Sequence, residues 1–466
     1  MESQTQAKPQ PHILVLPCPL QGHINPMLQF SKRLASKGPR VTLVATSSIS
    51  KSVKAIASHT INIEIISDGS TESITLDTST DSDAFFENFK VTVSQSLIKL
   101  IETQKRSRHP PKFVVYDSGM PWALNLAREL GLDGAPFFTQ SGAVNAIYYH
   151  GYKGTLKLPL EEPTVSLPSL PLLGANDLPS FMADTGTYRA LFRTLLNQLS
   201  NIDEANWIFC NTVYELEDEV LNWMTSQWPV KTIGPTIPSI YLDKRLEDDK
   251  EYGLSLFKPE VDACLKWLDT MEAGSVIYIS FGSLASLEAD QMEELTLGLK
   301  NSNCHFLWVV RDSEHKKLPA NFVQETTEKG LVVSWCNQLE VLAHKAIGCF
   351  MTHCGWNSTL EALSLGVPMV AMPQWTDQRT NAKFIVDVWK VGVRIKLDEK
   401  GLANKEEIEL CIREIMEGES GKEMKTNSVK WKKLAIEAVD EGGSSDKNIE
   451  GFVEKLQILA NMTKIY

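Results

Sequence analysis

Short apolar runs alternate with longer amphipathic stretches along most of the chain. The runs hold four to six residues and are rich in β-branched side chains, which is typical of strands, and the stretches between them are long enough for helices. In the first half of the chain, strands are predicted at residues 12–16, 41–45, 61–66, 113–116 and 207–210. In the second half, strands are predicted at residues 276–280, 306–310, 331–334, 348–351 and 367–371. Strands that alternate with helices predict an α/β fold built from βα units and parallel sheets.

The two sets of strands are separated by residues 234–253, which combine prolines and mixed charges without an apolar period. Such a composition is typical of a linker, and 466 residues are enough for more than one domain. We therefore predict an N-terminal domain over residues 1–240, a linker over 241–258 and a C-terminal domain over 259–448.

The end of the chain has a helical pattern that breaks at Gly442 and Gly443. This pattern predicts a last helix over residues 449–466, which we expect to pack back on the N-terminal domain. Five prolines between residues 159 and 180 exclude a continuous helix or a central strand there and predict an ordered surface loop.

Charge and composition exclude several classes of protein. The 46 basic and 58 acidic residues give a net charge of −12, and no block of lysine and arginine stands out, so a nucleic-acid partner is not expected. A small anionic ligand stays possible, because backbone N–H groups and one or two cations are enough to hold it. The sequence has no stretch of 18 apolar residues, so no integral membrane segment is predicted. The polar start MESQTQAKPQPH lacks the pattern of a signal peptide. The eight cysteines have no CxxC spacing, so we expect reduced thiols in a cytoplasmic protein. We also expect the protein to be a monomer.

His23 and Asp117 are the first candidate catalytic pair. Asn25 and Pro26 fit the start of a helix, which places His23 in the turn between the strand at 12–16 and that helix. Asp117 follows the strand at 113–116 and would reach the same carboxyl edge of the sheet, where ligands bind in open α/β folds. A neutral histidine oriented by a carboxylate is a general base. The alternative from the residues alone is a loop histidine and a helix-capping aspartate.

Residues 335–378 contain a second constellation, in which polar residues follow apolar runs repeatedly. The run at 348–351 passes through THCGWNS into a helix that should end at Gly366, and the N–H groups at the start of such a helix bind anions. The side chains in and near this constellation that could serve a phosphate, a ribose, a base or a sugar are His353, Trp356, Asn357, Ser358, Glu361, Trp335, Gln338, Asp377, Gln378 and, from SFGSLAS, Ser283. The alternative is a core tryptophan and ordinary helix caps.

Motifs of several other enzyme classes are missing. The chain has no GxGxxG after a strand, no GxxxxGK[ST], no HExxH and no GxSxG, which argues against dinucleotide oxidoreductases, P-loop NTPases, zincins and serine hydrolases. Asp81 and Asp83 form a DxD that could hold a divalent metal, but the surrounding polar run has no strand to position it, so no metal site is predicted.

Residues 335–378 resemble the signature motif of plant secondary-product UDP-glycosyltransferases, which belong to the inverting glycosyltransferase family 1. The resemblance extends to PCPLQGHINP near the start, to DSGMPW around Asp117 and to WKKLAIEAVDEGGSSDKN near the end. The chain is most similar to the subgroup that glucosylates small carboxylic acids, phenolics, steroids and triterpenes. This resemblance implies a GT-B fold with two Rossmann-like domains that face a cleft, the acceptor on the N-terminal side and the UDP-sugar on the C-terminal side.

The resemblance also implies roles for individual residues. Trp335 would stack on uracil, Gln338 and Glu361 would hold the ribose, and Asp377 and Gln378 would hold the sugar, with glucose favoured by the closing Gln378. His353, Asn357, Ser358 and Ser283 would contact the diphosphate. Trp356 and Thr139 would lie beside the donor sugar, and Cys336 and Gly355 belong to the same predicted UDP-sugar site. His23 and Asp117 match the family's catalytic base and its partner.

The predicted function is therefore transfer of glucose from UDP-glucose to a hydroxyl or carboxyl group of a small lipophilic acceptor, with inversion and without a metal or other cofactor. A binding protein with an idle nucleotide site is the alternative, and a polymer-forming enzyme of the same fold is disfavoured because no basic or apolar membrane-facing patch is found. Apolar candidates for the acceptor pocket are Phe85, Tyr148, Phe181, Met182 and Phe192. Each of them could equally belong to the core face of its own helix.

Overall fold

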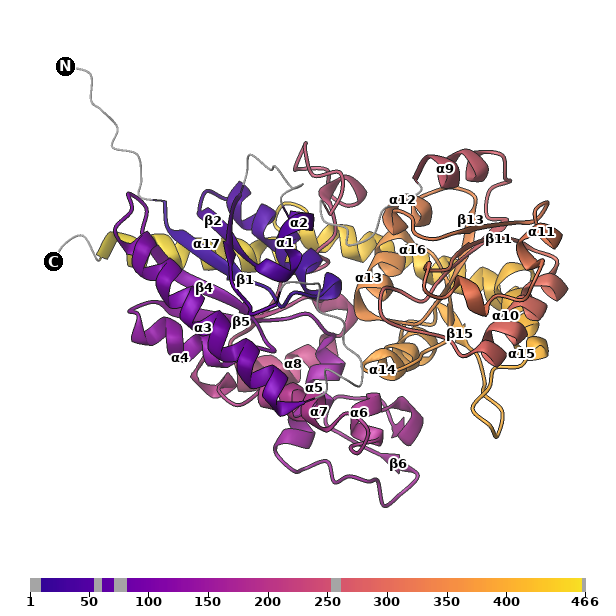
Figure 1. Ribbon diagram of the computed structural model, residues 1–466, viewed down its shortest axis with the longest axis horizontal. Helices are drawn as coiled ribbons and strands as arrows, with labels where there is room; N and C mark the ends of the chain where they lie inside the picture. The colour runs from indigo at the N-terminus through magenta and orange to yellow at the C-terminus, as the bar shows by residue number, and fades with distance from the viewer. Residues whose placement is uncertain (1–9, 54–60, 71–81, 253–260, 463–466) are drawn as a thin grey trace. The chain divides into compact units, whose positions relative to one another are not determined.

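The computed structural model describes residues 10–53, 61–70, 82–252 and 261–462 (Figure 1). The chain forms two compact units, one within residues 1–155, 186–256 and 437–466 and the other within residues 156–185 and 257–436. All ten predicted strands are present, and their ends lie within two residues of the predicted ends. Among the described helices, none combines the length and the apolar character needed to cross a membrane.

The first unit is built around a parallel sheet. Its strands are β1 (His12–Leu16), β2 (Arg40–Thr46), β3 (Asn62–Ile66), β4 (Pro111–Asp117), β5 (Asp133–Phe138), β8 (Ile208–Cys210) and β9 (Val230–Thr232). Its helices are α1 (Gln21–Ser36), α2 (Ser50–Val53), α3 (Asp83–Lys105), α4 (Trp122–Glu129), α5 (Gly142–Tyr152), α7 (Arg189–Asn197), α8 (Asp218–Gln227) and α17 (Ser444–Met462). The strand order is β3-β2-β1-β4-β5-β8-β9, so the direction of winding reverses between β1 and β4. At such a switch point the loops after the two strands diverge and leave room for a ligand.

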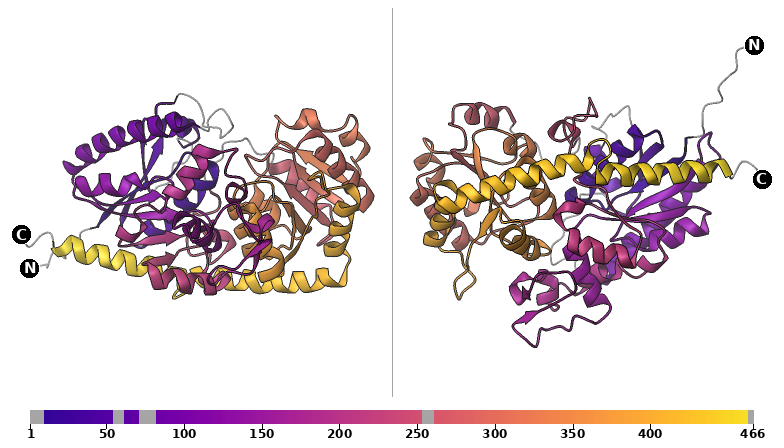
Figure 2. Two further views of the ribbon diagram at one scale, coloured as in Figure 1. Left: turned by 90° about the horizontal axis from the view of Figure 1, so that it is seen from below. Right: turned by 180° about the vertical axis from the view of Figure 1, so that it is seen from behind.

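Helices cover both faces of this sheet. On one face, apolar residues of α3 and α4 pack on Leu14, Val114 and Tyr116. On the other face, α1 and α17 pack on Ile13, Val115 and the strands beside them. Figure 1 shows α3 and α4 on the near side of the sheet, and Figure 2 shows the yellow helix α17 along its opposite side. Because the inner strands β1 and β4 are covered on both faces, their side chains are apolar in succession, which explains their clear sequence signal.

The last helix begins at Ser444, five residues earlier than expected, and residues 463–466 of the predicted helix lie outside the described part of the chain. Phe452 of α17 is fully buried against Phe113, with ring centroids 5.1 Å apart. A helix from the end of the sequence therefore completes the core of the first unit.

The described part of the expected linker, residues 241–252, is fixed on α1 by ion pairs. Arg33 donates to both carboxylate oxygens of Asp243 at 2.9 and 3.1 Å, and Lys32 Nζ lies 2.7 Å from Asp249 Oδ1. The side chain of Asp243 is fully buried. Residues 241–252 are therefore part of the first unit rather than a free connection, and residues 253–258 lie outside the described residues.

The second unit has a parallel sheet in the order β12-β11-β10-β13-β14-β15. Its strands are β10 (Val276–Ser280), β11 (His305–Val309), β12 (Gly330–Val333), β13 (Ile347–Thr352), β14 (Met369–Ala371) and β15 (Gly392–Arg394), and a separate pair is formed by β6 (Thr164–Val165) and β7 (Leu173–Gly174). Its helices are α6 (Ser180–Ala183), α9 (Val261–Asp269), α10 (Ala289–Ser302), α11 (Phe322–Glu325), α12 (Gln338–Leu342), α13 (Trp356–Leu365), α14 (Gln378–Lys383), α15 (Lys405–Met416) and α16 (Glu419–Val439). Figure 1 shows α10 and α15 side by side, and both pack on the sheet face that carries Ile277, Met351 and Trp308. The switch point lies between β10 and β13.

Residues 156–185, which the sequence places in the N-terminal domain, pack with the second unit. Arg394 of β15 donates to Asp177 Oδ1 and to the carbonyl of Asn176, each at 2.8 Å. Thr380 of α14 donates to the carbonyl of Asp177 at 2.7 Å. Sequence order alone does not reveal this assignment, because the contacts join residues about 200 positions apart.

Three strands of the two large sheets are absent from the prediction. β5 is a central strand but contains Gly134 and Pro136, both of which are rare in sheet interiors. β9 and β15 have three residues each, too few for a periodic signal. Packing against their neighbours, rather than their own propensity, makes these segments strands.

Candidate active site

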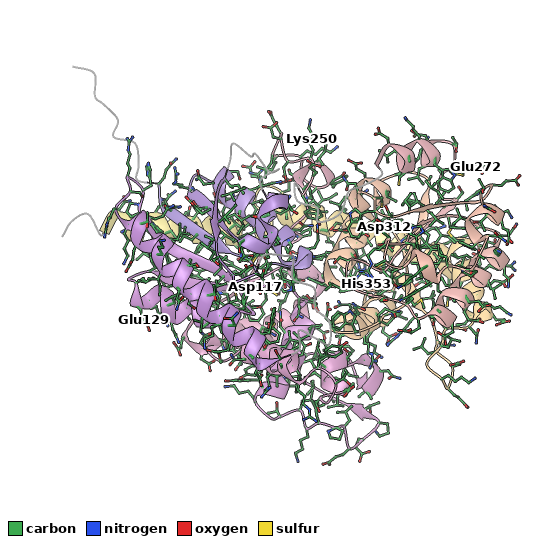
Figure 3. All side chains as sticks on the ribbon, viewed as in Figure 1. Asp117, Glu129, Lys250, Glu272, Asp312 and His353 are labelled. Atoms are coloured by element: carbon green, nitrogen blue, oxygen red, sulfur yellow. The ribbon has the colours of Figure 1, made fainter. Side chains whose placement is uncertain are left out.

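His23 and Asp117 lie at the switch point of the first unit. Asp117 is the last residue of β4, and His23 follows β1, which pairs with β4 in parallel. His23 Nδ1 is 2.6 Å from Asp117 Oδ2. Asp117, labelled in Figure 3, has a fully buried side chain, whereas the His23 side chain is 32% exposed. One member of the pair is thus fixed in the core and the other is accessible.

The geometry determines which nitrogen of the neutral His23 ring carries the proton. A carboxylate oxygen only accepts hydrogen bonds, so the Nδ1–H group donates to Asp117. Asp117 also accepts from the backbone N–H of Gly119 at 3.0 Å and of Cys18 at 3.5 Å, which holds the carboxylate in place. The Nε2 atom of the neutral ring is then the nitrogen without a proton, and its lone pair can accept one.

The helix that follows β1 begins earlier than predicted. α1 starts at Gln21 with Leu20 as its N-cap, so His23 lies in the first turn of the helix and Pro26 lies inside it. The N–H of His23 donates to the carbonyl of Leu20 at 2.9 Å. Asn25 and Pro26 are typical of a helix start, but this helix starts one turn before them. The result is a His23 backbone that is part of a helix rather than of a loop.

Thr139, predicted beside the donor sugar, lies next to the pair. It follows β5, and its hydroxyl oxygen is 3.4 Å from His23 Nδ1. β5 is adjacent to β4 in the sheet, which brings the residue after β5 to the same edge. The structure therefore joins Thr139 to His23 and Asp117.

In the second unit, the turn between β13 and α13 has the form of an anion-binding site. His353, Cys354 and Gly355 connect the two elements, and Cys354 has a positive φ of 65°. Gly355 is the N-cap and has no side chain to cap the first N–H groups of α13. α13 ends at Gly366 in the left-handed conformation, as predicted. Trp356, Asn357 and Ser358 form the first turn, so their N–H groups point out of the helix N-terminus.

The ring of His353, labelled in Figure 3, is enclosed by two glycines. A Cβ atom added at Gly282 would lie 2.8 Å from Nε2 of His353, and one added at Gly355 would lie 2.6 Å from the same atom. Burial lowers the pKa of His353 to about 4; the charge of Arg311 adds to the lowering, and a backbone hydrogen bond with Ser280 opposes it. His353 is therefore neutral at pH 7 and can act as a neutral hydrogen-bond donor.

Arg311 supports the loop after β10 that contains Ser283. Its guanidinium donates to the carbonyl oxygens of Ser283 and Ala285. Burial lowers the pKa of Arg311, with the nearby Glu314 charge acting in the opposite direction. Sequence reasoning missed Arg311, although a charged residue directly after the strand run FLWVV is a signal that could have found it. Arg311 therefore places a positive charge in contact with the backbone of the loop that contains Ser283.

Gln338, Ser358 and Glu361 form one hydrogen-bonded group. Gln338 Nε2 donates to Ser358 Oγ at 2.9 Å and to Glu361 Oε2 at 2.6 Å. Tyr278 donates from its hydroxyl to Gln338 Oε1 at 3.1 Å, and the same hydroxyl is 3.3 Å from the sulfur of Cys336. The structure thus brings four of the predicted UDP-sugar residues together around Tyr278, which the sequence did not indicate.

The predicted sugar residues Asp377 and Gln378 follow β14 in a tightly bonded turn. Gln378 Oε1 accepts from the N–H groups of Gln374 and Trp375 at 2.8 and 3.0 Å. Asp377 Oδ2 accepts from Asn381 Nδ2 at 2.7 Å, and Asn381 also donates to the carbonyl of Cys354 at 2.9 Å. Asn381 therefore joins this turn to the one before α13.

The two tryptophans of the predicted donor site differ. Trp335 follows β12 and is half-buried, as a base-stacking residue could be. Trp356 is only 4% exposed, and its ring lies 6.1 Å from that of Trp389. Its side chain therefore belongs to the core of the second unit, whereas its backbone is part of the α13 N-terminus.

The acceptor-pocket candidates are divided between the two units. Phe85 on α3 and Phe192 on α7 are half-buried in the first unit, and Tyr148 on α5 is fully buried there. Phe181 and Met182 lie on α6 in the second unit, and both are buried. The Phe181 ring contacts Trp375 edge to face at 5.7 Å. Of the DxD pair, Asp83 is the first residue of α3, and Asp81 lies outside the described residues.

Comparison with known proteins identifies the family. Residues 256–436 match the family described as UDP-glucoronosyl and UDP-glucosyl transferase. The chain is 57% identical over 449 residues to Mogroside I-E synthase of Siraitia grosvenorii, an alignment that covers 96% of this chain and 98% of the relative. This chain is a UDP-glycosyltransferase of plant family 1. It is also 53% identical over 446 residues to UDP-glycosyltransferase 74E1 of Arabidopsis thaliana, over 95% of this chain and 98% of the relative.

A solved UDP-glycosyltransferase structure has the same fold. The crystal structure of Os79 from O. sativa in complex with UDP is 37% identical, has a TM-score of 0.87, and covers 95% of this chain and all of that chain. The two Rossmann-like units of this UDP-glycosyltransferase therefore represent the GT-B fold, and the chain is an enzyme.

Proposed function

We propose that this UDP-glycosyltransferase transfers glucose from UDP-glucose to a hydroxyl or carboxyl group of a small lipophilic plant metabolite, such as a steroid, triterpene or phenolic. The observation that supports catalysis most directly is the 2.6 Å contact between the accessible His23 and the fully buried Asp117. The names of the relatives support a UDP-sugar donor and, for Mogroside I-E synthase, a mogroside as product. Membership of an enzyme family disfavours the alternative of a protein that only binds its ligands.

In the proposed reaction, His23 Nε2 takes the proton of the acceptor hydroxyl. The acceptor oxygen forms a bond to the anomeric carbon, the bond from that carbon to the UDP oxygen breaks, and UDP leaves with the electron pair. Attack from the face opposite UDP inverts the anomeric centre and produces a β-glucoside. Asp117 stabilises the imidazolium that forms, because its negatively charged carboxylate accepts a hydrogen bond from the Nδ1–H group of His23.

The donor diphosphate would be held by the N-terminus of α13, by the neutral His353 and by the loop of Ser283 that rests on Arg311. Helix N-termini and backbone N–H groups bind anions without a cluster of cations, which is compatible with a net charge of −12. Trp335, Gln338 and Glu361 would bind the uridine, and Asp377 and Gln378 the sugar. We therefore propose that no metal ion takes part, and we expect full turnover in excess EDTA.

The test is incubation of the full chain with UDP-glucose and a panel of hydroxyl and carboxylic acceptors, followed by detection of glucoside and released UDP. With a hydroxyl acceptor, His23→Ala should lower the rate about 100-fold or more, because an alcohol must lose its proton during attack. With a carboxylate acceptor, already ionised at pH 7, the same variant should be nearly as active as the parent. Full activity of His23→Ala on an alcohol would exclude His23 as the base.

A further inference from the structure

Thr376, the residue before Asp377 and Gln378, has a left-handed backbone conformation with φ of 56°. A β-branched residue rarely adopts this conformation, because its side chain crowds the backbone. Such a conformation persists only where the surrounding contacts hold it. The contacts of Thr376 therefore decide how the turn presents the two residues that follow.

Ser180 makes two hydrogen bonds to the main chain of Thr376. The N–H of Thr376 donates to Ser180 Oγ at 2.7 Å, and the N–H of Ser180 donates to the Thr376 carbonyl at 2.8 Å. The hydroxyl of Thr376 donates in turn to Asp377 Oδ1. Ser180 thus fixes the backbone on both sides of Thr376 Cα, and Thr376 fixes one oxygen of Asp377.

The segment that carries Ser180 is itself firmly attached to the second unit. Asp177, three residues earlier, is held by Arg394 at 2.8 Å, and its carbonyl accepts from Thr380 at 2.7 Å. Phe181, the next residue, is 3% exposed and packs edge to face on Trp375 of the same turn. Contacts on both sides of Ser180 therefore place its hydroxyl at the turn.

The turn's internal bonds orient Asp377 and Gln378 relative to their neighbours. Gln378 Oε1 is occupied by the N–H groups of Gln374 and Trp375, which leaves its amide NH₂ for a ligand. Asp377 Oδ2 is bonded to Asn381. A shift of the Thr376 backbone would move both side chains together, because each is bonded within this turn.

We propose that Ser180 is a positioning residue for recognition of the donor sugar: its two bonds hold Thr376 in the left-handed conformation that presents Asp377 and Gln378. This inference rests on the proposed function, in which Asp377 and Gln378 bind the sugar and not the nucleotide. Because Ser180 acts through Thr376 on the two residues proposed to bind the sugar, its removal should affect UDP-glucose more than UDP.

Ser180→Ala removes the acceptor of the Thr376 N–H and tests this role in the full chain. We expect the KM for UDP-glucose to rise about tenfold, the effect of one lost hydrogen bond that leaves a half-buried N–H without an acceptor. The inhibition constant of UDP should change less than twofold, which separates sugar binding from nucleotide binding. Ser180→Thr keeps a hydroxyl and should restore most of the KM, and Thr185→Ala, at an exposed position of the same segment, should leave it unchanged. If Ser180→Ala does not fold, Ser180→Cys, with a weaker acceptor of similar size, should raise the KM about threefold.

Gln378→Ala separates the failure of this inference from the failure of the proposed function. If Gln378→Ala raises the KM for UDP-glucose and Ser180→Ala does not, the role of Ser180 is wrong while the sugar assignment holds. If Ser180→Ala weakens UDP and UDP-glucose equally, Ser180 has only a structural role. If Gln378→Ala leaves the KM for UDP-glucose unchanged, the sugar assignment of this turn is wrong, and the inference about Ser180 fails with it.

Discussion

Replacement of Asp117 by asparagine would change which nitrogen of His23 carries the proton, while the shape of the buried side chain stays the same. Asp117 Oδ2 accepts from His23 Nδ1 at 2.6 Å, and Oδ1 accepts from the Gly119 N–H at 3.0 Å. An asparagine has one oxygen and one NH₂ group at these two places, so it can satisfy only one of the two donors.

The structure indicates which orientation the amide will take. With its NH₂ toward Gly119, two donors would face each other at 3.0 Å in a buried site, which costs about 1–3 kcal/mol. With its NH₂ toward His23, the ring can become the acceptor by moving its proton to Nε2, and the contact that suffers is the long 3.5 Å bond from Cys18. The second orientation is therefore favoured. It protonates the atom that should act as the base, and it also removes the charge that stabilises the imidazolium.

We expect Asp117→Asn to lower the rate with a hydroxyl acceptor about 10²- to 10⁴-fold, the range observed when a base loses its orienting carboxylate. The assay is initial-rate formation of glucoside at saturating UDP-glucose, with circular dichroism and UDP binding as controls for folding. With a carboxylate acceptor the loss should be less than about tenfold, because no proton has to be removed. A folded Asp117→Asn protein that keeps more than a third of its rate on an alcohol would refute the proposed role of the pair.

Three further predictions concern the donor region and the core. Gly355→Ala should push the His353 ring aside, because the new Cβ would lie 2.6 Å from Nε2 of His353. It should therefore weaken UDP binding about tenfold, as measured by calorimetry. In the control Gly451→Ala the new Cβ meets open space in α17, and the free energy of unfolding should instead rise by about 0.5–1 kcal/mol. The lowered pKa of His353 makes the native state bind fewer protons than the unfolded state between pH 6.5 and about 4, so the free energy of unfolding falls as the pH drops through this window. In urea titrations, the free energy of unfolding of a His353→Gln protein should fall by about 2–3 kcal/mol less over the same window. An equal dependence on pH in both proteins would contradict the prediction. Arg33→Ala leaves the buried Asp243 without its bidentate partner and should lower the free energy of unfolding by about 3–5 kcal/mol in denaturant titrations, whereas a loss below about 1 kcal/mol would show that water replaces the guanidinium.

The inner strands of both sheets could be predicted because burial on both faces requires continuous apolar runs, as in β1 and β10. β5 could not, since Gly134 and Pro136 disguise a strand that exists through its pairing with β4 and β8. The start of α1 was also missed. The residue before its first turn, Leu20, is not a usual capping residue, so the sequence does not mark a helix that begins at Gln21. In the folded unit the first turn of this helix is bonded to the sheet through His23 and Asp117.

The candidate site shows the same division. His23, Asp117 and His353 could be singled out because each lies at or after the carboxyl end of a strand, and the parallel strands of a sheet bring these ends to one edge of that sheet. Arg311, Tyr278 and Ser180 could not be assigned a role, because their importance lies in the partners they reach rather than in a motif.

The sequence by itself determined the alternation of strands and helices, the edge at which the polar residues gather and, through the motif at residues 335–378, the family. These features depend on residues that are near one another in the chain. Only the tertiary structure decided that residues 156–185 belong with the second unit and that Ser180 holds Thr376. Such contacts join positions roughly 200 or more residues apart, and their free energy comes from burial and hydrogen bonds that form only when the chain is folded.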